Sequence, residues 1–445
     1  MTEEITCYDD AVSYLNSTPR FTEKHSIAQT AQMLSYLGSP ETSFRIIHTA
    51  GSNGKGSVCA ALASVLRCAG YSCGLFTSPH LVTVRERFVI DGDPVTEEQF
   101  LEDFLDIRGM LRDHPECSHP TYFEYLFLMA VIRFRKAGVQ AAVLETGLGG
   151  RLDATNAVVR PDVCVITSVS LEHTEYLGSS IPQIAAEKAG IIKPGVPVVY
   201  DASDPEAAQV IQTAARDLQA PALPVYPQQI RNAVMSRSGI RFGFSGEYDL
   251  YDLQVASKAP YQQMNMALAV CAAEQFLSRT DDPQEADAAR KRRLYNDPYR
   301  TAAIEAGIAR CSFPGRMEEK ENGLILDGAH NPAGIEAFLN GVRGMSEGKQ
   351  ILLFACMQDK NYTEMLRSIA VSGLFELIIF TGLDSGRAAD PQKLSAMLKA
   401  GAGEQILCIP QPREALRKAR EVRKKGQYIF AAGSLYLVGM LESAS

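Results

Sequence analysis

A glycine-rich loop near the start of the chain could bind a triphosphate. The segment GSNGKGS, residues 51–57, follows a short apolar run and precedes a stretch with helical spacing. Glycines let backbone N–H groups close around phosphate oxygens, and a helix N-terminus adds positive potential. Lys55 can reach the outer phosphates and the Ser57 hydroxyl can bind Mg²⁺. The sequence differs from the common P-loop motif, because Thr49 replaces the leading Gly and Gly56 is inserted before the serine. An ordinary glycine-rich turn is the alternative.

Three further segments carry side chains that could do chemistry. ETGLGGRLDATN places Glu145, Arg151 and Asp153 beside glycines, directly after an apolar run. SLEHTEYLG carries His173, and AAEKAGIIKPG carries Lys188. Ligands collect at the carboxyl ends of strands in open α/β sheets, which favours a site here. Taken singly, each segment also has an ordinary explanation: a flexible turn, a structural histidine, and an exposed lysine at a helix C-terminus.

The elements that must position these residues alternate along the chain. Short apolar runs and longer helical patterns follow one another, which is typical of parallel sheets with crossover helices. We therefore predict an α/β fold: a P-loop ATPase domain with a mostly parallel sheet, followed by a smaller Rossmann-like domain. Strands are expected at 45–49, 71–77, 141–146, 162–167 and 196–200, and then at 324–327, 351–356, 376–380, 405–410 and 428–432.

One boundary is predicted between the two domains. The stretch 278–310 is mostly polar, of mixed charge and interrupted by Pro283 and Pro298, which indicates a solvated helix or linker. The first domain is therefore expected to cover residues 1–310 and the second residues 311–445.

Composition excludes several classes of function. The 445 residues carry 44 Lys and Arg against 52 Asp and Glu, with no polybasic block, which argues against nucleic acid or anionic membrane as partner. No apolar run approaches the ~20 residues that cross a bilayer, and the N-terminus is acidic, so we expect a cytoplasmic protein. The ten cysteines occur singly, which predicts buried free thiols rather than zinc ligands or disulfides.

The ordered set of motifs resembles the Mur ligase superfamily, and within it the folylpolyglutamate synthases and the bifunctional dihydrofolate and folylpolyglutamate synthases. The matching segments are AGSNGKGS, FTSPHL, RERF, TYFEY, ETGLGGRLDATN, SLEHTEYLG, AAEKAGIIKPG, FPGRME, DGAHNP and AAGSLYLVG. They span nearly the whole chain. The resemblance implies ATP-dependent ligation of L-glutamate to a folate or dihydropteroate carboxylate through an acyl phosphate, with release of ADP.

The resemblance also implies roles for individual residues. Catalytic roles fall to Lys55, His173, Lys188 and Arg316, and ATP binding to Asn53, Gly54, Lys55, Gly56, Ser57, Asn265, Arg316, Asp327 and His330. Ser57, Ser78 and Glu145 match ligands of one Mg²⁺, and His173 and a carbamylated Lys188 match ligands of a second. Because magnesium prefers oxygen, the histidine leaves room for Mn²⁺. A monovalent cation is a further expected ligand.

The predicted carbamate makes a physical demand on Lys188. Addition of CO₂ requires a neutral amine, and hence a lysine whose pKa is depressed by desolvation or nearby positive charge.

The chain also departs from the family pattern at three places. Tyr261-Gln262 replaces the usual His-Gln near the adenine, Phe313 replaces a Trp, and Glu172-His173 replaces Asp-His.

Folate contacts are implied by the same resemblance. Thr121 and Phe123 match the pterin or pteroate region, and an aromatic ring can stack on a flat heterocycle. His80, Arg87 and Arg151 are candidate contacts for carboxylate or phosphate. The alternative is that TYFEYLFLMAVIRF is an apolar helix whose aromatic side chains pack in the core.

Rival functions differ from this prediction in identifiable features. A synthase that only extends folate tails is one alternative, although the complete SPHL and TYFE segments favour both activities. Another amino-acid ligase of the superfamily is a second; peptidoglycan ligases carry a whole domain before the P-loop, where this chain has 50 residues. A nucleotide-binding regulator would be expected to lose phosphate or metal groups that are present here. We expect a monomer.

Overall fold

A computed structural model of the chain describes residues 5–18, 27–236, 238–278, 297–345, 347–398 and 405–442. The chain divides into two compact units. The first comprises Met1–Asn232, Phe242–Gln254 and Gln263–Cys311, and the second comprises Ala233–Arg241, Val255–Gln262 and Ser312–Ser445. The sequence predicts a single boundary near residue 310. The second unit also contains two short segments that precede that boundary.

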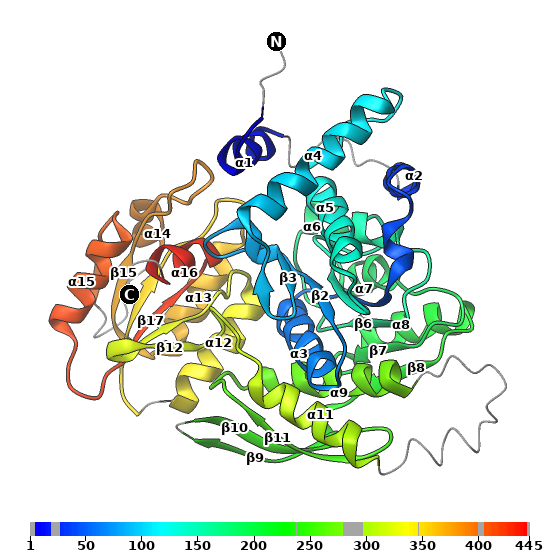
Figure 1. The fold of residues 1–445 in the computed structure, drawn as a ribbon. Coiled ribbons are helices and arrows are strands. Elements are labelled where there is room, and N and C mark those ends of the chain that lie inside the picture. The colour runs from blue at the N-terminus through cyan, green and yellow to red at the C-terminus, as the bar shows by residue number, and fades with distance from the viewer. Residues whose placement is uncertain are drawn as a thin grey trace. The chain divides into compact units, whose positions relative to one another are not determined.

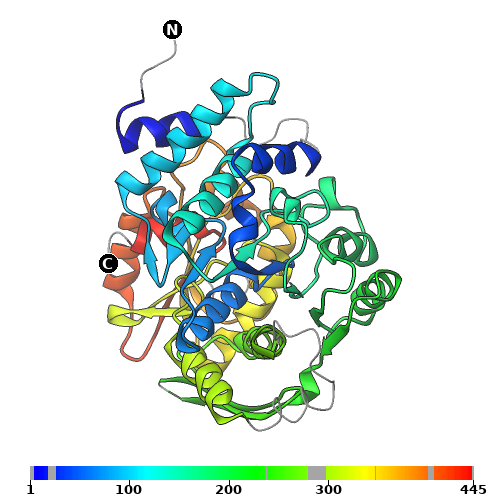
Figure 2. The same cartoon turned by 45° about the vertical axis from the view of Figure 1, so that its right-hand side comes forward.

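An eight-stranded sheet forms the centre of the first unit (Figures 1 and 2). Its order is β4-β3-β2-β5-β1-β6-β7-β8, in which the run from β2 to β8 is parallel while β3 and β4 pair antiparallel at one edge. The strands are β1 (Arg45–Ala50), β2 (Cys73–Phe76), β3 (Phe88–Ile90), β4 (Asp93–Pro94), β5 (Ala141–Glu145), β6 (Val163–Ile166), β7 (Val198–Asp201) and β8 (Ala222–Val225). The mostly parallel sheet that the apolar runs predict is therefore present. The antiparallel edge strands and β8 were not predicted.

The helices of the first unit pack on this sheet and on one another. They are α1 (Tyr8–Ser17), α2 (Ile27–Tyr36), α3 (Lys55–Cys68), α4 (Glu97–Asp113), α5 (Tyr122–Ala137), α6 (Thr174–Leu177), α7 (Ile181–Ala189), α8 (Pro205–Asp217), α9 (Gln262–Ser278) and α11 (Pro298–Arg310). Helix α5 is buried along almost its whole length, and its aromatic side chains share a core with Phe76 and Leu144 of the sheet. The alternative that this segment is an apolar helix whose aromatic side chains pack in the core describes most of α5, whereas Phe123 near its start is half-buried.

Helix α11 falls within the stretch predicted to be a solvated helix or linker. It packs against α3, where Ser64 donates a hydrogen bond to the carbonyl of Gly307 at 2.6 Å. A Cβ on Gly307 would overlap the backbone of Val65, so the two helices touch at a glycine. This part of the predicted linker is a packed helix, while residues 279–296 lie outside the described residues.

A three-stranded sheet contributes residues to both units. Its order is β11-β10-β9, with β9 (Ile230–Ser236), β10 (Gly239–Ser245) and β11 (Leu250–Val255). Strands β10 and β11 alternate buried and exposed positions, as expected for strands with one solvated face. The divisions between the units fall within all three strands. This sheet was not predicted from the sequence.

The second unit is built on a six-stranded sheet of order β12-β13-β17-β14-β15-β16. All strands are parallel except β12, which pairs antiparallel with β13. The strands are β12 (Glu318–Lys320), β13 (Leu324–Leu326), β14 (Gln350–Phe354), β15 (Phe375–Phe380), β16 (Gln405–Cys408) and β17 (Ile429–Ala432). The helices are α12 (Pro332–Met345), α13 (Tyr362–Ser372), α14 (Pro391–Met397), α15 (Pro412–Val422) and α16 (Leu435–Glu442). The five predicted strands are the five parallel ones.

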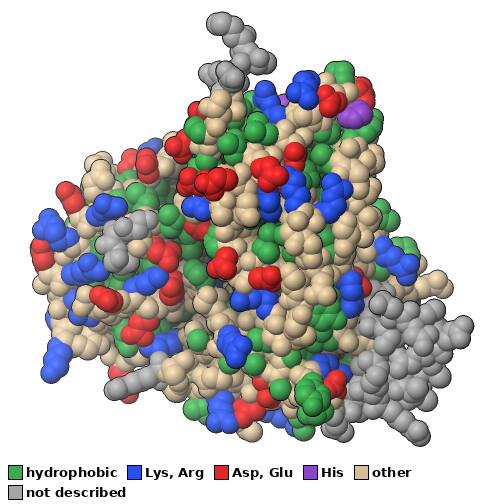
Figure 3. All heavy atoms as spheres, viewed as in Figure 1, with side chains coloured by type: hydrophobic (Ala, Val, Ile, Leu, Met, Phe, Trp, Pro, Cys, Tyr) green, Lys and Arg blue, Asp and Glu red, His purple; other side chains and the backbone are tan. Residues whose placement is uncertain are grey.

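Surface features agree with the composition. On the face shown in Figure 3, acidic and basic side chains are interspersed rather than gathered by sign. No helix among the described residues has both the length and the apolar character that crossing a bilayer requires. All ten cysteines are free thiols, but not all are buried as predicted: Cys7 and Cys408 are exposed, and Cys68 and Cys117 are half-buried.

Candidate active site

The glycine-rich loop connects β1 to α3, as predicted. Gly51 and Gly54 have φ angles of +149° and +91°, which side chains other than glycine rarely adopt. Neither position has room for a Cβ, which would overlap the Thr167 hydroxyl at Gly51 and the Asn265 amide oxygen at Gly54. Asn265, predicted to lie near the adenine, therefore packs directly against the loop. Helix α3 begins directly after the loop. Its first backbone N–H groups have no acceptors within the helix, so they can bind an anion such as a phosphate.

Lys55 is the first residue of α3 and folds back over the loop. Its Nζ donates to the carbonyls of Gly51 at 2.9 Å and Ser52 at 3.4 Å. The loop is tied to the segment after β6, because the Thr167 hydroxyl donates to the Asn53 carbonyl at 2.7 Å. The lysine therefore lies where it could reach phosphates that enter the loop.

The residues predicted to bind the first Mg²⁺ converge beside this loop. Glu145, at the end of β5, is buried, and its Oε2 accepts a hydrogen bond from the Ser78 backbone N–H at 3.0 Å. A Cβ on Gly56 would lie 3.6 Å from the same oxygen, and Ser57 follows it in α3. Within the described ranges, no three His, Cys, Asp or Glu side chains gather closely enough to hold a metal by themselves. A cation here would need hydroxyl, phosphate or water oxygens together with Glu145, a donor set that suits Mg²⁺.

Lys188 is fully buried in α7 and pairs with Glu172. Its Nζ lies 2.8 Å from Glu172 Oε1. The pKa of Lys188 is lowered to about 8, because burial and the Lys55 charge together lower it by more than the Glu172 carboxylate raises it. Burial alone would raise the pKa of Glu172, but the charges of Lys188 and Lys55 outweigh it and bring that pKa to about 2. The predicted carbamate site thus has the depressed amine pKa that carbamylation requires.

His173 follows Glu172 and precedes the short helix α6. Its φ of +45° lies in the left-handed region, which is uncommon for a non-glycine residue. A protonated His173 would also lower the pKa of Glu172. The structure therefore brings Lys55, Glu172, His173 and Lys188 into one electrostatic cluster. The pairing of Glu172 with Lys188 was not predicted, although its position in place of the family's aspartate was noted.

The residues predicted to bind folate lie around the start of α5. Thr121 is the N-cap of this helix and accepts from the Glu124 N–H at 3.4 Å, while Glu124 accepts from the Thr121 N–H at 2.7 Å. The Phe123 ring lies beside Phe76, with ring centroids 5.6 Å apart. A Cβ on Gly147 would approach that ring to 2.7 Å.

The three basic candidates for folate binding have partners within the chain. Arg87 Nε donates to His80 Nδ1 at 3.0 Å, and its guanidinium lies 5.6 Å from the Tyr122 ring centroid. Arg151 pairs with Glu187, 2.8 Å away, on the helix that carries Lys188. The structure therefore places Arg87 and His80 beside α5 and ties Arg151 to α7 instead.

The predicted residues of the second unit form their own cluster. Buried Asp327 accepts from the Tyr261 hydroxyl at 2.8 Å and from the N–H groups of Met317 at 2.9 Å and Ala329 at 2.8 Å. Burial raises the pKa of Asp327, an effect that the nearby Arg316 charge opposes. His330 Nδ1 lies 2.8 Å from the Gly328 carbonyl. Tyr261, which departs from the family pattern, thus has a defined partner that the sequence did not reveal.

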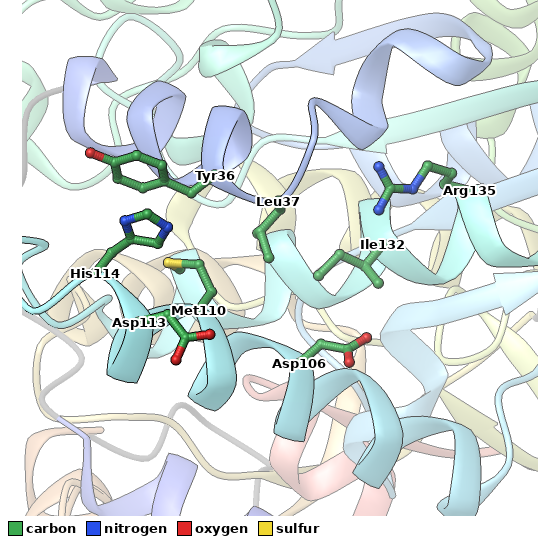
Figure 4. A pocket seen from close by; sticks show the side chains of 8 residues that line it. All are labelled: Tyr36, Leu37, Asp106, Met110, Asp113, His114, Ile132 and Arg135. Carbon is green, nitrogen blue, oxygen red and sulfur yellow. The ribbon is translucent and has the colours of Figure 1, made fainter.

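A separate pocket of about 340 Å³ lies among α2, α4 and α5 (Figure 4). The rings of Tyr36 and His114 stack 3.7 Å apart at one end, and Arg135 lies at the other. None of the predicted site residues lines this pocket.

Comparison with known proteins assigns the family. Residues 49–273 match the Mur ligase middle domain, and residues 315–435 match the Mur ligase glutamate ligase domain. The chain is 31% identical to a dihydrofolate synthase/folylpolyglutamate synthase of Bacillus subtilis, over 97% of this chain and 98% of that protein. Two solved structures each share 26% identity with this chain. Mycobacterium tuberculosis folylpolyglutamate synthase complexed with ADP and AMPPCP matches with a TM-score of 0.84 over 98% of both chains. E. coli FolC in complex with DHPP and ADP matches with a TM-score of 0.82 over 99% of this chain and 97% of that chain.

The matched regions include the glycine-rich loop, Glu145 and Lys188 in the first unit and Asp327 in the second. The expected resemblance and the α/β fold are confirmed. The chain is an ATP-dependent ligase of the Mur superfamily and belongs to the family of folylpolyglutamate and dihydrofolate synthases.

Proposed function

We propose that this ligase joins L-glutamate to the carboxylate of both dihydropteroate and folates, so that it makes dihydrofolate and extends folate tails. The observation that carries the proposal is the arrangement at the end of β1. A glycine loop and a helix N-terminus meet there, with Lys55 above the loop and the buried carboxylate of Glu145 beside it. A relative of nearly the same length carries both synthase names.

The reaction needs activation because a carboxylate and an amine lie uphill of an amide in water. The acceptor carboxylate attacks the γ-phosphorus of ATP, the bond to the ADP oxygen breaks, and an acyl phosphate forms. The glutamate amine then attacks the acyl carbon, expels phosphate and loses a proton. Positioning and charge neutralisation carry most of such catalysis, and we assign them to Lys55 in the first unit and Arg316 in the second.

Magnesium would be held by Ser57, Ser78 and Glu145. Their donor set of hydroxyl and carboxylate oxygens fits the ion, and it would neutralise phosphate charge when bound. Asn53, Gly54 and Gly56 are proposed to contact the triphosphate through the loop backbone. Asn265, Asp327 and His330 are the remaining proposed ATP contacts.

We propose that Lys188 is carbamylated and, with His173, serves a second metal, Mg²⁺ or Mn²⁺. Its burial and its pKa of about 8 support this, because a sizeable fraction of neutral amine is available near neutral pH. The ion pair with Glu172 shows how the unmodified lysine is accommodated.

The acceptor is proposed to bind at the start of α5. The Phe123 ring is half-buried beside the loop that follows β5, where it could stack on a flat heterocycle. Thr121, His80 and Arg87 would supply polar contacts there. Arg151 is the weakest of the proposed contacts, because Glu187 already occupies its guanidinium.

Glutamate incorporation tests the function directly. Purified protein, ATP, Mg²⁺ and labelled L-glutamate are incubated with 7,8-dihydropteroate in one reaction and tetrahydrofolate in another, with phosphate release measured in parallel. Incorporation in both reactions is the expected result, and incorporation in only one restricts the enzyme to that acceptor. If neither reaction incorporates glutamate and Lys55→Ala matches the wild type, the folate assignment is wrong and another amino-acid acceptor must be sought.

A further inference from the structure

A buried histidine lies on the strand that leads into the glycine loop. His48 of β1 has no exposed surface, and its Nε2 lies 2.8 Å from the hydroxyl oxygen of Thr155. Thr155 belongs to the segment after β5, more than a hundred residues further along the chain. The contact therefore links the strand before the phosphate loop to the segment that follows Glu145.

The direction of this hydrogen bond follows from its neighbours. The single hydroxyl proton of Thr155 is donated to Asp153 Oδ1, which is 2.6 Å away. The Thr155 oxygen can then only accept, so His48 must donate through Nε2–H. His48 Nδ1 is left as an acceptor and has no hydrogen-bond partner in the part of the chain that the structure describes. Burial, together with the nearby Lys193 charge, lowers the pKa of His48 to about 3, so the ring stays neutral.

Asp153 connects Thr155 to the backbone of Gly147 and Leu148 through hydrogen bonds. Its Oδ1 also accepts from the Thr155 N–H at 3.0 Å. Its Oδ2 accepts from the N–H groups of Gly147 and Leu148, both at 2.9 Å. The carboxylate is buried, yet it receives four hydrogen bonds, so its charge is compensated.

The far end of this chain of hydrogen bonds touches the Phe123 ring. Gly147 lies so close to the ring that an added Cβ would be 2.7 Å from Cζ and 2.8 Å from Cε2. On another side the ring packs against Phe76. The position of the Gly147–Leu148 backbone therefore limits where this ring can lie.

We propose that His48, Thr155 and Asp153 form a positioning chain that fixes the Gly147–Leu148 backbone against Phe123 and thereby sets the affinity for the flat heterocyclic acceptor. The inference rests on the proposed function. None of these three residues needs to touch the acceptor for the chain to act. Its effect should fall on acceptor binding, and the ATP site should be largely unaffected.

The geometry supplies matched variants. Glutamine places an N–H donor near the position of Nε2, whereas asparagine places it near Nδ1, which has no partner to lose. His48→Gln should therefore preserve the chain and His48→Asn should break it. Thr155→Ser keeps the hydroxyl, and Thr155→Val removes it at nearly constant volume. Gly147→Ala displaces the Phe123 ring without altering the buried bonds.

The test is steady-state kinetics with the acceptor that the wild type uses, varied at saturating ATP and glutamate, and then with ATP varied. His48→Asn and Thr155→Val should raise the acceptor KM about tenfold, as expected for one broken buried hydrogen bond. Gly147→Ala should also raise it, because the added Cβ displaces the Phe123 ring. All three should leave the ATP KM within about twofold. His48→Gln and Thr155→Ser should stay within about threefold of the wild type in both. Calorimetric titration of the same acceptor, without ATP or glutamate, should show the same order of affinities.

Three results would overturn the inference while leaving the proposed function intact: an active wild type with unchanged acceptor KM in the variants, equal rises in acceptor and ATP KM, or equal effects of Asn and Gln at position 48. If the buried variants do not fold, Gly147→Ala decides alone, and an unchanged acceptor KM in that variant contradicts the inference. A wild type that ligates glutamate to neither acceptor overturns both.

Discussion

The ammonium group of Lys188 lies 2.8 Å from a carboxylate oxygen of Glu172 in the interior of the first unit. The two charges have opposite effects on each other's proton affinity, and both are buried. Each charge is therefore compensated only while its partner is charged, and loss of either charge leaves the other buried without a counter-charge. This pair links the folding stability of the unit to the chemistry proposed for Lys188.

Removing the carboxylate should destabilise the protein in a pH-dependent way. Glu172→Gln leaves Lys188 buried without a counter-charge, which should cost about 3 kcal/mol at pH 7. The folded pKa of Glu172, about 2, lies below its usual 4.5, so its stabilisation is present above pH 4.5 and is lost as the pH falls through 2. The difference between wild type and variant should therefore shrink in acid. Urea unfolding followed by circular dichroism measures it, since the chain has no tryptophan. A difference that is constant between pH 7 and 3 would contradict the pairing.

Lys188→Ala should abolish ligation, with a fall in kcat of about a hundredfold or more, because a carbamate oxygen ligand is lost. A short carboxylic acid should restore part of the rate to this variant. Lys188→Arg is the matched control, since it keeps the charge but cannot be carbamylated and should not be rescued. Mass spectrometry should show a CO₂ adduct that is lost in bicarbonate-free acid. A wild-type rate in Lys188→Ala would exclude the carbamate.

Recovery of activity after CO₂ depletion should depend on pH. The amine pKa of about 8 means that the neutral fraction rises steeply between pH 6.5 and 8.5. Reactivation at a fixed concentration of dissolved CO₂, rather than of total bicarbonate, should accordingly be faster at the higher pH. Equal rates at both pH values would show that the neutral amine of Lys188 is not involved.

Gly54→Ala should inactivate the enzyme. A Cβ at this position would overlap the Asn265 amide oxygen at a φ of +91°, so the phosphate loop must move. We expect kcat/KM for ATP to fall about a hundredfold, in line with small misplacements of reacting groups. Gly70→Ala is the control, because Gly70 has a similar φ of +88° but nothing within 4 Å of the added Cβ. It should cost about 1 kcal/mol of stability and leave the rate unchanged. Equal activities of the two variants would contradict the tight packing of the loop.

A buried ion network in the first unit should matter for stability and not for catalysis. Arg133 lies 2.7 Å from buried Asp103 and 2.6 Å from Glu102. Arg133→Met should lower the free energy of unfolding by about 3 kcal/mol, because the Asp103 charge loses its main partner. Arg112→Met, which removes an exposed pair with Asp113, should cost less than about 0.5 kcal/mol. Urea unfolding separates the two variants, and kcat for both should equal that of the wild type.

The central parallel strands could be predicted because they are buried on both faces and appear as continuous apolar runs, whereas the parallel edge strand β8 is mostly exposed or half-buried and was not predicted. The antiparallel strands at the sheet edges could not be predicted: β3 and β4 are only three and two residues long, and β12 has the sequence EEK. Strands β10 and β11 alternate buried and exposed residues instead of forming a continuous apolar run, and no strand is predicted there from the sequence. The stretch that contains α11 is predicted to be a solvated helix or linker, and its charged residues mask the small face that includes Gly307 and packs on α3.

The candidate site was predicted more from the order of its motifs than from any single residue. Lys55, Glu145 and Lys188 follow from those motifs, but their partners are set by tertiary structure. The bond from Arg151 to Glu187 and that from Tyr261 to Asp327 join residues that no local pattern connects. The capping role of Thr121 was visible, since T-Y-F-E has the spacing of a capping box.

The division of the three-stranded sheet between the units bears on how this family can be recombined. The chain passes from one unit to the other five times, at 232/233, 241/242, 254/255, 262/263 and 311/312. The second unit is therefore not one continuous C-terminal segment. A fusion protein that takes only residues 312–445 from this chain would lack Tyr261. The buried carboxylate of Asp327 would then lose the hydrogen bond from the Tyr261 hydroxyl. A chimera with a relative would have to exchange residues 233–241 and 255–262 together with the C-terminal segment, so single-crossover shuffling should yield few folded hybrids.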